Sequence, residues 1–236
     1  MKTAIIVSGI FREIENAIPT WNFDGDYFLF TQNTYQGPRS TDEEHSILPE
    51  LEKYKDKFKA IVTLDRLIDV GYDFSTTLAN QTWKWKIAYN FLEPYIQKYN
   101  YERFIIIRPD LFFHIYGNLD EVKIEPNILH STSAICTDGL GYLFANDTWL
   151  MCDKDVFKLL SNFYDYIHPI ITTSNIHQHL ANYLNLNNIT VTPELINHGQ
   201  VFPLRREFDH MFENNKLKDK YSVNDLYKAI QEWTQD

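Results

Sequence analysis

The sequence predicts an α/β fold with a mainly parallel sheet flanked by helices, and three observations lead to this prediction. Four short apolar segments occur in the first half of the chain, at residues 3–8, 26–32, 59–64 and 103–108. They are apolar on both faces, as parallel strands are when helices cover the sheet on each side. Helical candidates separate them, and strands that alternate with crossover helices form parallel sheets. No linker or repeat divides the 236 residues, so we expect a single domain.

Two helical candidates lie between these strands. Residues 42–57 are charged and amphipathic, and Pro49 is expected to divide them into two short pieces. Residues 76–99 carry apolar side chains at helical spacing, and Pro94 is expected to kink this helix or to begin a second one.

The second half of the chain is less regular. We expect strands at 111–116, 128–132, 141–146 and 189–193, and helices at 153–166, 175–186 and roughly 222–234.

Composition and charge exclude several classes of function. The formal net charge of −10 leaves no basic footprint for non-specific binding to nucleic acid or to an anionic membrane. No segment approaches the ~20 apolar residues of a membrane span, so no membrane insertion is expected. The two cysteines form neither a disulfide framework nor a zinc pattern, which favours a cytoplasmic location. Eight glycines are few, and neither Gly-rich phosphate-loop pattern occurs.

Polar residues follow three of the four predicted strands. They are Ser8, Gly9 and Arg12 after the first strand, Thr31, Gln32 and Asn33 at the end of the second, and Arg108, Pro109 and Asp110 after the fourth. In open parallel sheets, ligands bind beyond the carboxyl ends of the strands. If the strands are neighbours, these side chains converge at one ligand-binding edge.

The segment FIIIRPDLFF at residues 104–113 is the most informative of these strand ends. Pro109 cannot donate to a strand ladder and therefore interrupts the strand. A carboxylate placed against apolar strands is costly to bury unless it meets a cation or a metal. From the residues alone, an Arg108–Asp110 ion pair that caps a strand end explains the segment as well as a ligand site does.

Four further residues are candidates for chemistry, each with a structural alternative. Arg12 is placed to clamp a phosphate, or to form a surface ion pair with a nearby glutamate. Asp147 and Asp138 lie in polar loops, where a carboxylate acts as a general base for an acceptor hydroxyl or simply caps a turn. His198 is a candidate late metal ligand or a plain loop histidine.

Several ordered segments resemble one family of small bacterial and viral proteins, the GT-A-type glycosyltransferases with an RPD motif. YERFIIIRPDLFF at 101–113 is similar to the motif segment itself, with Glu102 where the family usually has Asp. AIIVSGIFRE at 4–13 is similar to its first strand and Arg-bearing loop. The helix with Gln81, Trp83 and Lys86, and FANDTWLMCDKDVFKLL at 144–160, also match, so the similarity touches most of residues 3–165.

The resemblance implies a GT-A-like fold and a nucleotide-sugar-dependent enzyme. Residues 1–110 would be the nucleotide-binding half and 111–236 the acceptor-side half. Asp110 would correspond to the aspartate that holds Mn²⁺ or Mg²⁺ on the donor's diphosphate, whereas Arg108 stands where a first aspartate often lies. One carboxylate with waters and phosphate oxygens then suffices for the metal, or Arg108 replaces part of the metal's charge. Trp83, two residues before the core-facing Trp85, points in another direction and is free to face the donor.

The function we expect is that of a metal-dependent hexosyl- or pentosyltransferase in the cytoplasm of a bacterial or virus-infected cell. A surface or lipopolysaccharide glycan is the first expected acceptor. The Asn-, Ile-, Lys- and Tyr-rich composition also suits an AT-rich viral genome with a modified nucleobase as acceptor, although the acidic charge counts against it. The alternatives are a non-catalytic nucleotide-sugar or glycan-binding module, suggested by Arg108 in the motif, and a phosphotransferase or nucleotidyltransferase.

Overall fold

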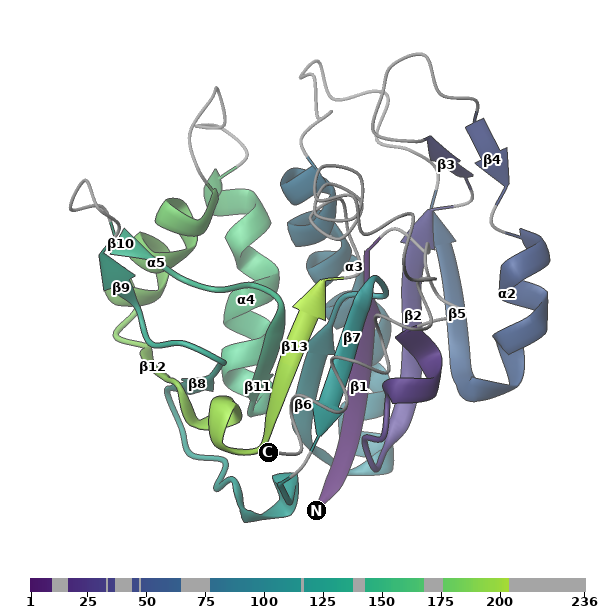
Figure 1. Ribbon diagram of the computed structural model, residues 1–236. Helices are drawn as coiled ribbons and strands as arrows, with labels where there is room; N and C mark the ends of the chain where they lie inside the picture. Colours follow the sequence, from purple (N-terminus) through teal and green to yellow (C-terminus); the bar gives the residue numbers. More distant parts are fainter. Residues whose placement is uncertain are drawn as a thin grey trace, which may run out of the picture.

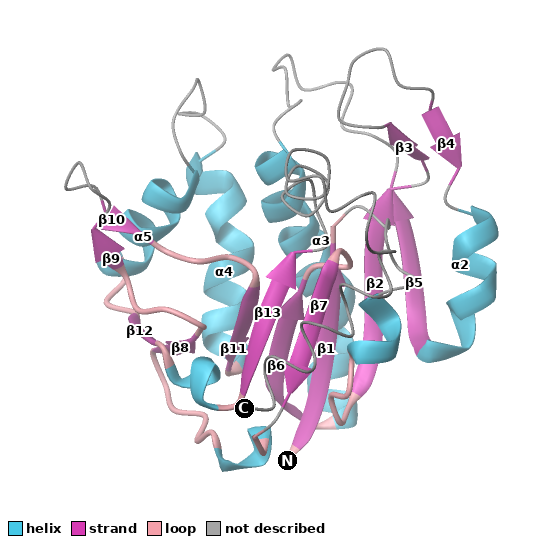
Figure 2. Cartoon of the chain, in the orientation of Figure 1, coloured by secondary structure: helices cyan, strands magenta, loops and turns pink. Residues whose placement is uncertain are grey.

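The structure, a computed structural model, describes residues 1–9, 17–32, 34–36, 44–46, 48–64, 77–115, 117–137, 143–167 and 176–203. A seven-stranded sheet with the order β12-β8-β11-β6-β1-β2-β5 forms its centre (Figures 1 and 2). The strands are β1 (Lys2–Ser8), β2 (Asp26–Gln32), β5 (Phe58–Leu64), β6 (Tyr101–Ile107), β8 (Ile128–His130), β11 (Trp149–Cys152) and β12 (Thr190–Thr192). Of these strands only β11 is antiparallel to its neighbours, so the predicted α/β fold with a mainly parallel sheet is confirmed.

Helices and shorter strand pairs surround this sheet. The helices are α2 (Leu48–Tyr54), α3 (Thr77–Tyr99), α4 (Lys154–Ile167) and α5 (Ile176–Leu186), with 3-10 turns at Ile18–Thr20, Lys55–Lys57, Leu119–Glu121 and Glu194–Asn197. The small pairs are β3 (Thr34–Gln36) with β4 (Glu44–Ser46), β9 (Cys136–Thr137) with β10 (Leu143–Phe144), and β7 (Leu111–Ile115) with β13 (Gly199–Pro203). Figure 1 shows α3 and α4 behind the sheet and the β7–β13 pair in front of it.

Each face of the sheet builds its own hydrophobic core, because successive strand side chains point to opposite sides. Ala4, Ile6, Phe28, Phe30, Phe104 and Ile106 pack against α3 and α4. Their neighbours Ile5, Val7, Leu29, Ile105 and Ile107 pack against the first 3-10 turn, β7 and the indole of Trp21. The apolar character of both faces, which predicted the parallel strands, is therefore explained by two covering layers.

The predicted elements agree with the structure in most places, and the differences have local causes. Pro49 does not divide a helix; it lies in the first turn of α2, where a proline is tolerated, and the chain before it forms β4. α3 continues as one helix through Pro94 to Tyr99. β11 is an additional strand, four residues long, between the predicted elements at 141–146 and 153–166. The predicted helix at 222–234 lies outside the described residues.

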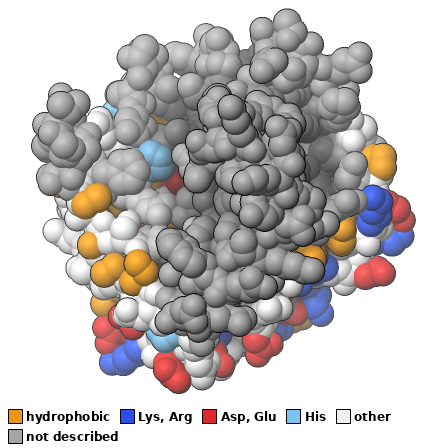
Figure 3. All heavy atoms as spheres, in the orientation of Figure 1, with side chains coloured by type: hydrophobic (Ala, Val, Ile, Leu, Met, Phe, Trp, Pro, Cys, Tyr) orange, Lys and Arg blue, Asp and Glu red, His pale blue; other side chains and the backbone are white. Residues whose placement is uncertain are grey.

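The described part of the surface carries charges of both signs. On the face shown in Figure 3, the Lys and Arg side chains of the described residues are interspersed with Asp and Glu. None of the described helices is both long enough and apolar enough to cross a membrane.

Candidate active site

The chain leaves the central sheet at the carboxyl end of β6. β6 pairs in parallel with β1, and Ile107 lies opposite Val7, so both strands end at the same level. Arg108, Pro109 and Asp110 then form a turn that leads into β7. Because Pro109 has no N–H to donate, the β6 ladder stops there and the chain changes direction. The turn therefore places Arg108 and Asp110 at the edge where a parallel sheet binds its ligand.

Gly9 allows the loop after β1 to approach this turn closely. Its φ of +153° is a conformation that side chains rarely adopt, and a Cβ atom there would lie 2.8 Å from the Cδ atom of Pro109. Its N–H donates to the carbonyl oxygen of Phe30 on β2, at 3.2 Å. Gly9, predicted as a donor-binding residue, thus has a structural reason to be glycine: it lets β1 and the Arg108–Asp110 turn pack together.

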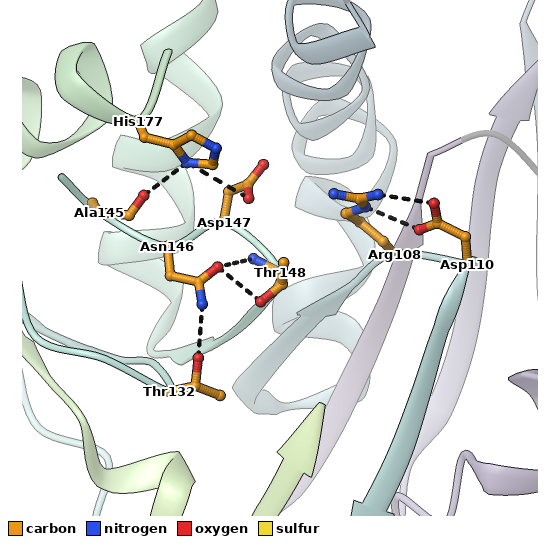
Figure 4. A network of polar contacts seen from close by, with 8 residues as sticks. All are labelled: Arg108, Asp110, Thr132, Ala145, Asn146, Asp147, Thr148 and His177. Atoms are coloured by element: carbon orange, nitrogen blue, oxygen red, sulfur yellow. Dashed lines mark hydrogen bonds and ion pairs between the residues drawn. The ribbon is translucent and has the colours of Figure 1, made fainter. Parts of the chain in front are cut away.

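Arg108 and Asp110 form a buried, bidentate ion pair (Figure 4). The guanidinium Nε donates to Oδ1 of Asp110 at 3.0 Å and its second nitrogen donates to Oδ2 at 2.8 Å. The two side chains are 15% and 5% exposed. Burial would lower the pKa of Arg108, but the charge and hydrogen bonds of Asp110 and the charge of Asp147 outweigh it and raise this pKa. Arg108 is therefore a fixed cation at the ligand edge.

This geometry bears on whether Asp110 can hold a divalent ion. Both carboxylate oxygens of Asp110 already accept hydrogen bonds from Arg108. Within the described residues, no three His, Cys, Asp or Glu side chains gather closely enough to form a metal site. These described residues do not fit a divalent ion while both oxygens of Asp110 are bonded to Arg108. An ion that binds Asp110 would have to displace the guanidinium of Arg108.

Asp147 reaches the same edge from the opposite direction along the sheet. β11 is antiparallel to β6, with Trp149 opposite Ile107, so the residues that precede β11 lie beyond the carboxyl end of β6. Asp147 is 4% exposed, and its charge contributes to the raised pKa of Arg108. Asn146 fixes the turn before β11, because its Oδ1 accepts from the backbone N–H and the hydroxyl of Thr148 at 3.0 and 2.8 Å.

His177, in the first turn of α5, lies beside Asp147 (Figure 4). Its Nδ1 is 3.0 Å from the carbonyl oxygen of Ala145 and 3.8 Å from Oδ1 of Asp147. A hydrogen bond from Nδ1 to the carbonyl leaves the other ring nitrogen as the acceptor. His177 was not predicted from the sequence as a site residue. No spacing rule connects it to Asp147, because the two lie in separate elements far apart along the chain.

Of the remaining candidates for the donor site, the structure describes Ser8, Thr31 and Trp83 but not Arg12. Ser8 and Thr31 are fully buried at the carboxyl ends of β1 and β2, and the Oγ of Ser8 has no hydrogen-bond partner among the described residues. Trp85 is 1% exposed and belongs to the core, whereas Trp83 is only partly buried, as predicted from their different directions on α3. Arg12 lies outside the described residues.

His198 is not brought together with Asp110. It immediately precedes β13, whose Gly199 pairs with Ile115, and its carbonyl oxygen accepts from the N–H of Gly117 at 2.9 Å. Asp110 lies at the other end of β7, roughly 15–20 Å along the strand at about 3.3 Å per residue. The two side chains therefore cannot share one metal ion in this arrangement. Asp138, the other acidic candidate, lies outside the described residues.

Lys84 is a further candidate, which was not predicted from the sequence. It is 1% exposed, and its ammonium donates to Oε1 of Gln32, the last residue of β2, at 3.5 Å. Burial lowers the pKa of Lys84 to about 7. The signal was present in the helical spacing, because Lys84 precedes Ala88 and Leu92 at intervals of four on the stripe that faces the sheet.

Comparisons with known proteins give distant structural similarities. No protein-family model and no curated protein matches the chain. The apo-form glycosyltransferase GlyE of Streptococcus pneumoniae TIGR4 is similar over 92% of this chain and 50% of its own, with 14% identity and a TM-score of 0.49. A glycosyltransferase involved in the glycosylation of the major capsid of PBCV-1 is similar over 81% of this chain and 80% of its own, with 9% identity and a TM-score of 0.42.

The chain thus spans about half the length of GlyE. Similarities this distant carry no information about the chemistry of this chain.

Proposed function

We propose that the protein is a glycosyltransferase that moves a sugar from a nucleoside-diphosphate sugar to an acceptor hydroxyl. One observation carries this proposal: the buried Arg108–Asp110 pair stands at the carboxyl edge of two adjacent parallel strands, β1 and β6. It does so within residues 101–113, the segment that resembles the RPD motif of GT-A-type glycosyltransferases. The edge is where an α/β sheet binds a nucleotide, and the pair supplies a fixed positive charge there.

Arg108 is the residue proposed to stabilise the leaving group. As the bond between sugar and diphosphate breaks, negative charge develops on the departing diphosphate, and a preorganised cation lowers the energy of that transition state. A planar guanidinium is suited to phosphate oxygens because it offers several N–H donors in a fixed geometry. Asp110 holds the guanidinium through two of these donors, so its role is to position Arg108.

Asp147 is the residue proposed to act on the acceptor. It is a buried carboxylate whose charge acts on Arg108, and its closeness to Arg108 supports this assignment. A carboxylate in this position can accept the proton of an attacking hydroxyl. His177, whose Nδ1 lies 3.8 Å from Oδ1 of Asp147, is proposed to help orient this carboxylate.

Mn²⁺ or Mg²⁺ is the cofactor implied by the family resemblance. The alternative is that the guanidinium of Arg108 supplies positive charge to the diphosphate in place of the metal. If Arg108 replaces the metal's charge, donor binding is expected to survive removal of divalent ions by EDTA. If a divalent ion displaces Arg108 from Asp110, EDTA is expected to abolish the metal-dependent part of donor binding.

Our proposals for the acceptor and for the location of the protein rest on the sequence alone. A surface or lipopolysaccharide glycan is the first acceptor we propose, with a modified nucleobase second. A cytoplasmic location is proposed on the small number of cysteines.

A non-catalytic nucleotide-sugar or glycan-binding module is the second candidate. The observation that favours it is that both carboxylate oxygens of Asp110 accept hydrogen bonds from Arg108. Among the described residues, no other group of carboxylates or histidines could hold the metal that many sugar transfers use. Such a module would bind a nucleotide sugar without breaking it.

One experiment separates the two candidates and tests the proposal. The purified protein is screened by thermal shift against nucleotide sugars with Mn²⁺ and with EDTA, because a ligand that binds only the native state raises the melting temperature. Each nucleotide sugar that binds is then incubated with the protein, and the released nucleoside diphosphate is measured. Binding with slow hydrolysis supports the glycosyltransferase, binding with none supports the module, and the absence of any binding contradicts both.

A further inference from the structure

A buried lysine stands on the α3 face of the sheet, at the same edge as Arg108. Lys84 lies in the N-terminal third of α3, is 1% exposed and donates one hydrogen bond, to Gln32 at 3.5 Å. In the described part of the chain, no carboxylate forms an ion pair with Lys84. An ammonium group buried this deeply without a counter-charge is costly, which makes its presence here informative.

The strands place other polar groups on the same face. Ala4 and Ile6 of β1 pack against α3, so Ser8, two residues further, points to that side as well. On β6 the same alternation runs from Phe104 and Ile106 to Arg108. Ser8, Gln32, Lys84 and Arg108 therefore share one face at the carboxyl edge.

Two of these groups have unused hydrogen-bonding capacity. The hydroxyl of Ser8 is fully buried and has no partner among the described residues. The ammonium of Lys84 has three donors, of which one reaches Gln32 at the limit of hydrogen-bond distance. Buried polar groups left unsatisfied in this way are uncommon, and they point to an acceptor that arrives from outside the chain.

The charged groups around Lys84 on the packed elements are few. Lys86, two residues further along α3, forms an ion pair with Asp165 of α4 at 2.6 Å. From the end of β6 comes Arg108, whose charge is matched by Asp110. On this face β1 and β2 also carry Lys2 and Asp26, which pair with each other at 3.3 Å at the opposite end of the strands. At the carboxyl edge their polar side chains on this face are the neutral Ser8 and Gln32. Burial is thus the cause that lowers the pKa of Lys84 to about 7.

We propose that Lys84, together with Gln32 and Ser8, binds an anionic oxygen of the donor's diphosphate and takes up a proton as it does so. This inference rests on the proposed function, since it names a further residue of the same donor site. In the free protein Lys84 is largely neutral above pH 7, which reduces the cost of its burial. The arriving diphosphate supplies the missing counter-charge and restores the protonated form. Donor binding and protonation of Lys84 are then coupled by linkage.

The test is a calorimetric measurement of proton uptake. UDP-glucose, UDP-galactose and GDP-mannose are titrated into the protein in buffers of different ionisation enthalpy, at pH 6 and at pH 8. Their diphosphates stay ionised across this range, so the ligand itself takes up no proton. With the free pKa about 7, binding should take up about 0.9 proton per ligand at pH 8 and about 0.1 at pH 6.

Two variants identify the group that takes up the proton. Lys84→Met keeps the length and apolar stem but removes the charge, and should weaken binding about 10- to 100-fold and abolish the uptake. Its melting temperature should equal or exceed that of the wild type, because a buried unpaired amine is removed. Lys86→Met, on the same helix but paired with Asp165, is the matched control and should keep both the affinity and the uptake.

Binding of a nucleotide sugar without proton uptake at pH 8, or uptake that persists in Lys84→Met, overturns the inference while leaving the proposed function intact. If no nucleotide sugar binds the wild type, the proposed function is wrong and this inference falls with it.

Discussion

Asp110→Asn is the substitution that tests the centre of the site most directly. It keeps the shape of the side chain and removes the charge that holds Arg108. Breaking a buried ion pair by removing one partner costs about 3–5 kcal/mol. Because Arg108 keeps 15% exposure and also feels the charge of Asp147, we expect the lower end, about 3 kcal/mol. For a chain of this size that is a fall in melting temperature of roughly 6–12 °C.

Donor turnover by Asp110→Asn should fall by more than the loss of folded protein explains. Once an amide replaces the carboxylate of Asp110, the guanidinium of Arg108 is no longer preorganised for the leaving diphosphate. Donor hydrolysis should therefore drop about 100-fold or more. Both quantities are measured on the same protein, the first by thermal denaturation and the second by release of nucleoside diphosphate well below the melting temperature.

Two further variants make the test decisive. Asp110→Asn combined with Arg108→Met removes the unpaired charge and should recover part of the lost stability but none of the turnover. Asp120→Asn breaks another ion pair of β6, between Arg103 and Asp120 at the opposite end of the strand, and should leave turnover unchanged. Undiminished turnover in Asp110→Asn, with a lowered melting temperature, would make Asp110 a structural residue and refute the assignment of the site.

Two of the other predictions concern the surroundings of the site, and the third concerns the opposite end of the sheet. Asp147→Asn should lower turnover by about 10²–10⁴ with donor affinity unchanged within about twofold, and equal losses of both would contradict its role toward the acceptor. Gly9→Ala forces a strained φ and a contact of 2.8 Å with Pro109, so denaturant unfolding should show a loss of about 1–3 kcal/mol, and an unchanged midpoint would refute this packing. Burial opposes a low pKa at Asp26, but the hydrogen bond from Tyr101 at 2.6 Å and two lysines lower it below its usual value of 3.8. The ionised Asp26 therefore contributes its full stabilisation above the pKa it has in the unfolded chain, and this contribution is lost as the pH falls through its pKa in the folded protein. In Asp26→Asn, the free energy of unfolding measured in urea should depend less on pH between roughly 5 and 2 than in the wild type. The same pH dependence in both proteins would contradict this.

The parallel part of the sheet was predictable because its signal is local. Each of β1, β2, β5 and β6 is a continuous apolar run, and a run of that kind reports burial on both faces. β11 was not predicted as a strand of the sheet, since its four residues pair with β6 and β8, which lie far away in the chain. Its antiparallel direction is what brings Asp147 to the ligand edge, and no local pattern encodes a direction of pairing.

The site itself was predictable only in part, for the same reason. Arg108 and Asp110 are neighbours in the chain, and their pairing follows from the Pro109 turn. His177 approaches Asp147 only because α5 packs beside the loop before β11. Lys84 was overlooked because a lysine on a helix is usually solvated, although its position on the apolar stripe of α3 indicated otherwise.

The pairing of β7 with β13 has a consequence for the order in which the site is assembled. β7 begins directly after Asp110, and its partner strand starts only at Gly199, so the contact closes a loop of more than eighty residues. A nascent chain that has reached Thr192 already contains every strand of the seven-stranded sheet, yet β7 still has no partner. Contacts with such long sequence separation are slow to form because the loop entropy must be overcome first. During folding, the Arg108–Asp110 turn is therefore fixed early on the side of β6 and last on the side of β7. We expect the protein to become active only after its central sheet has formed.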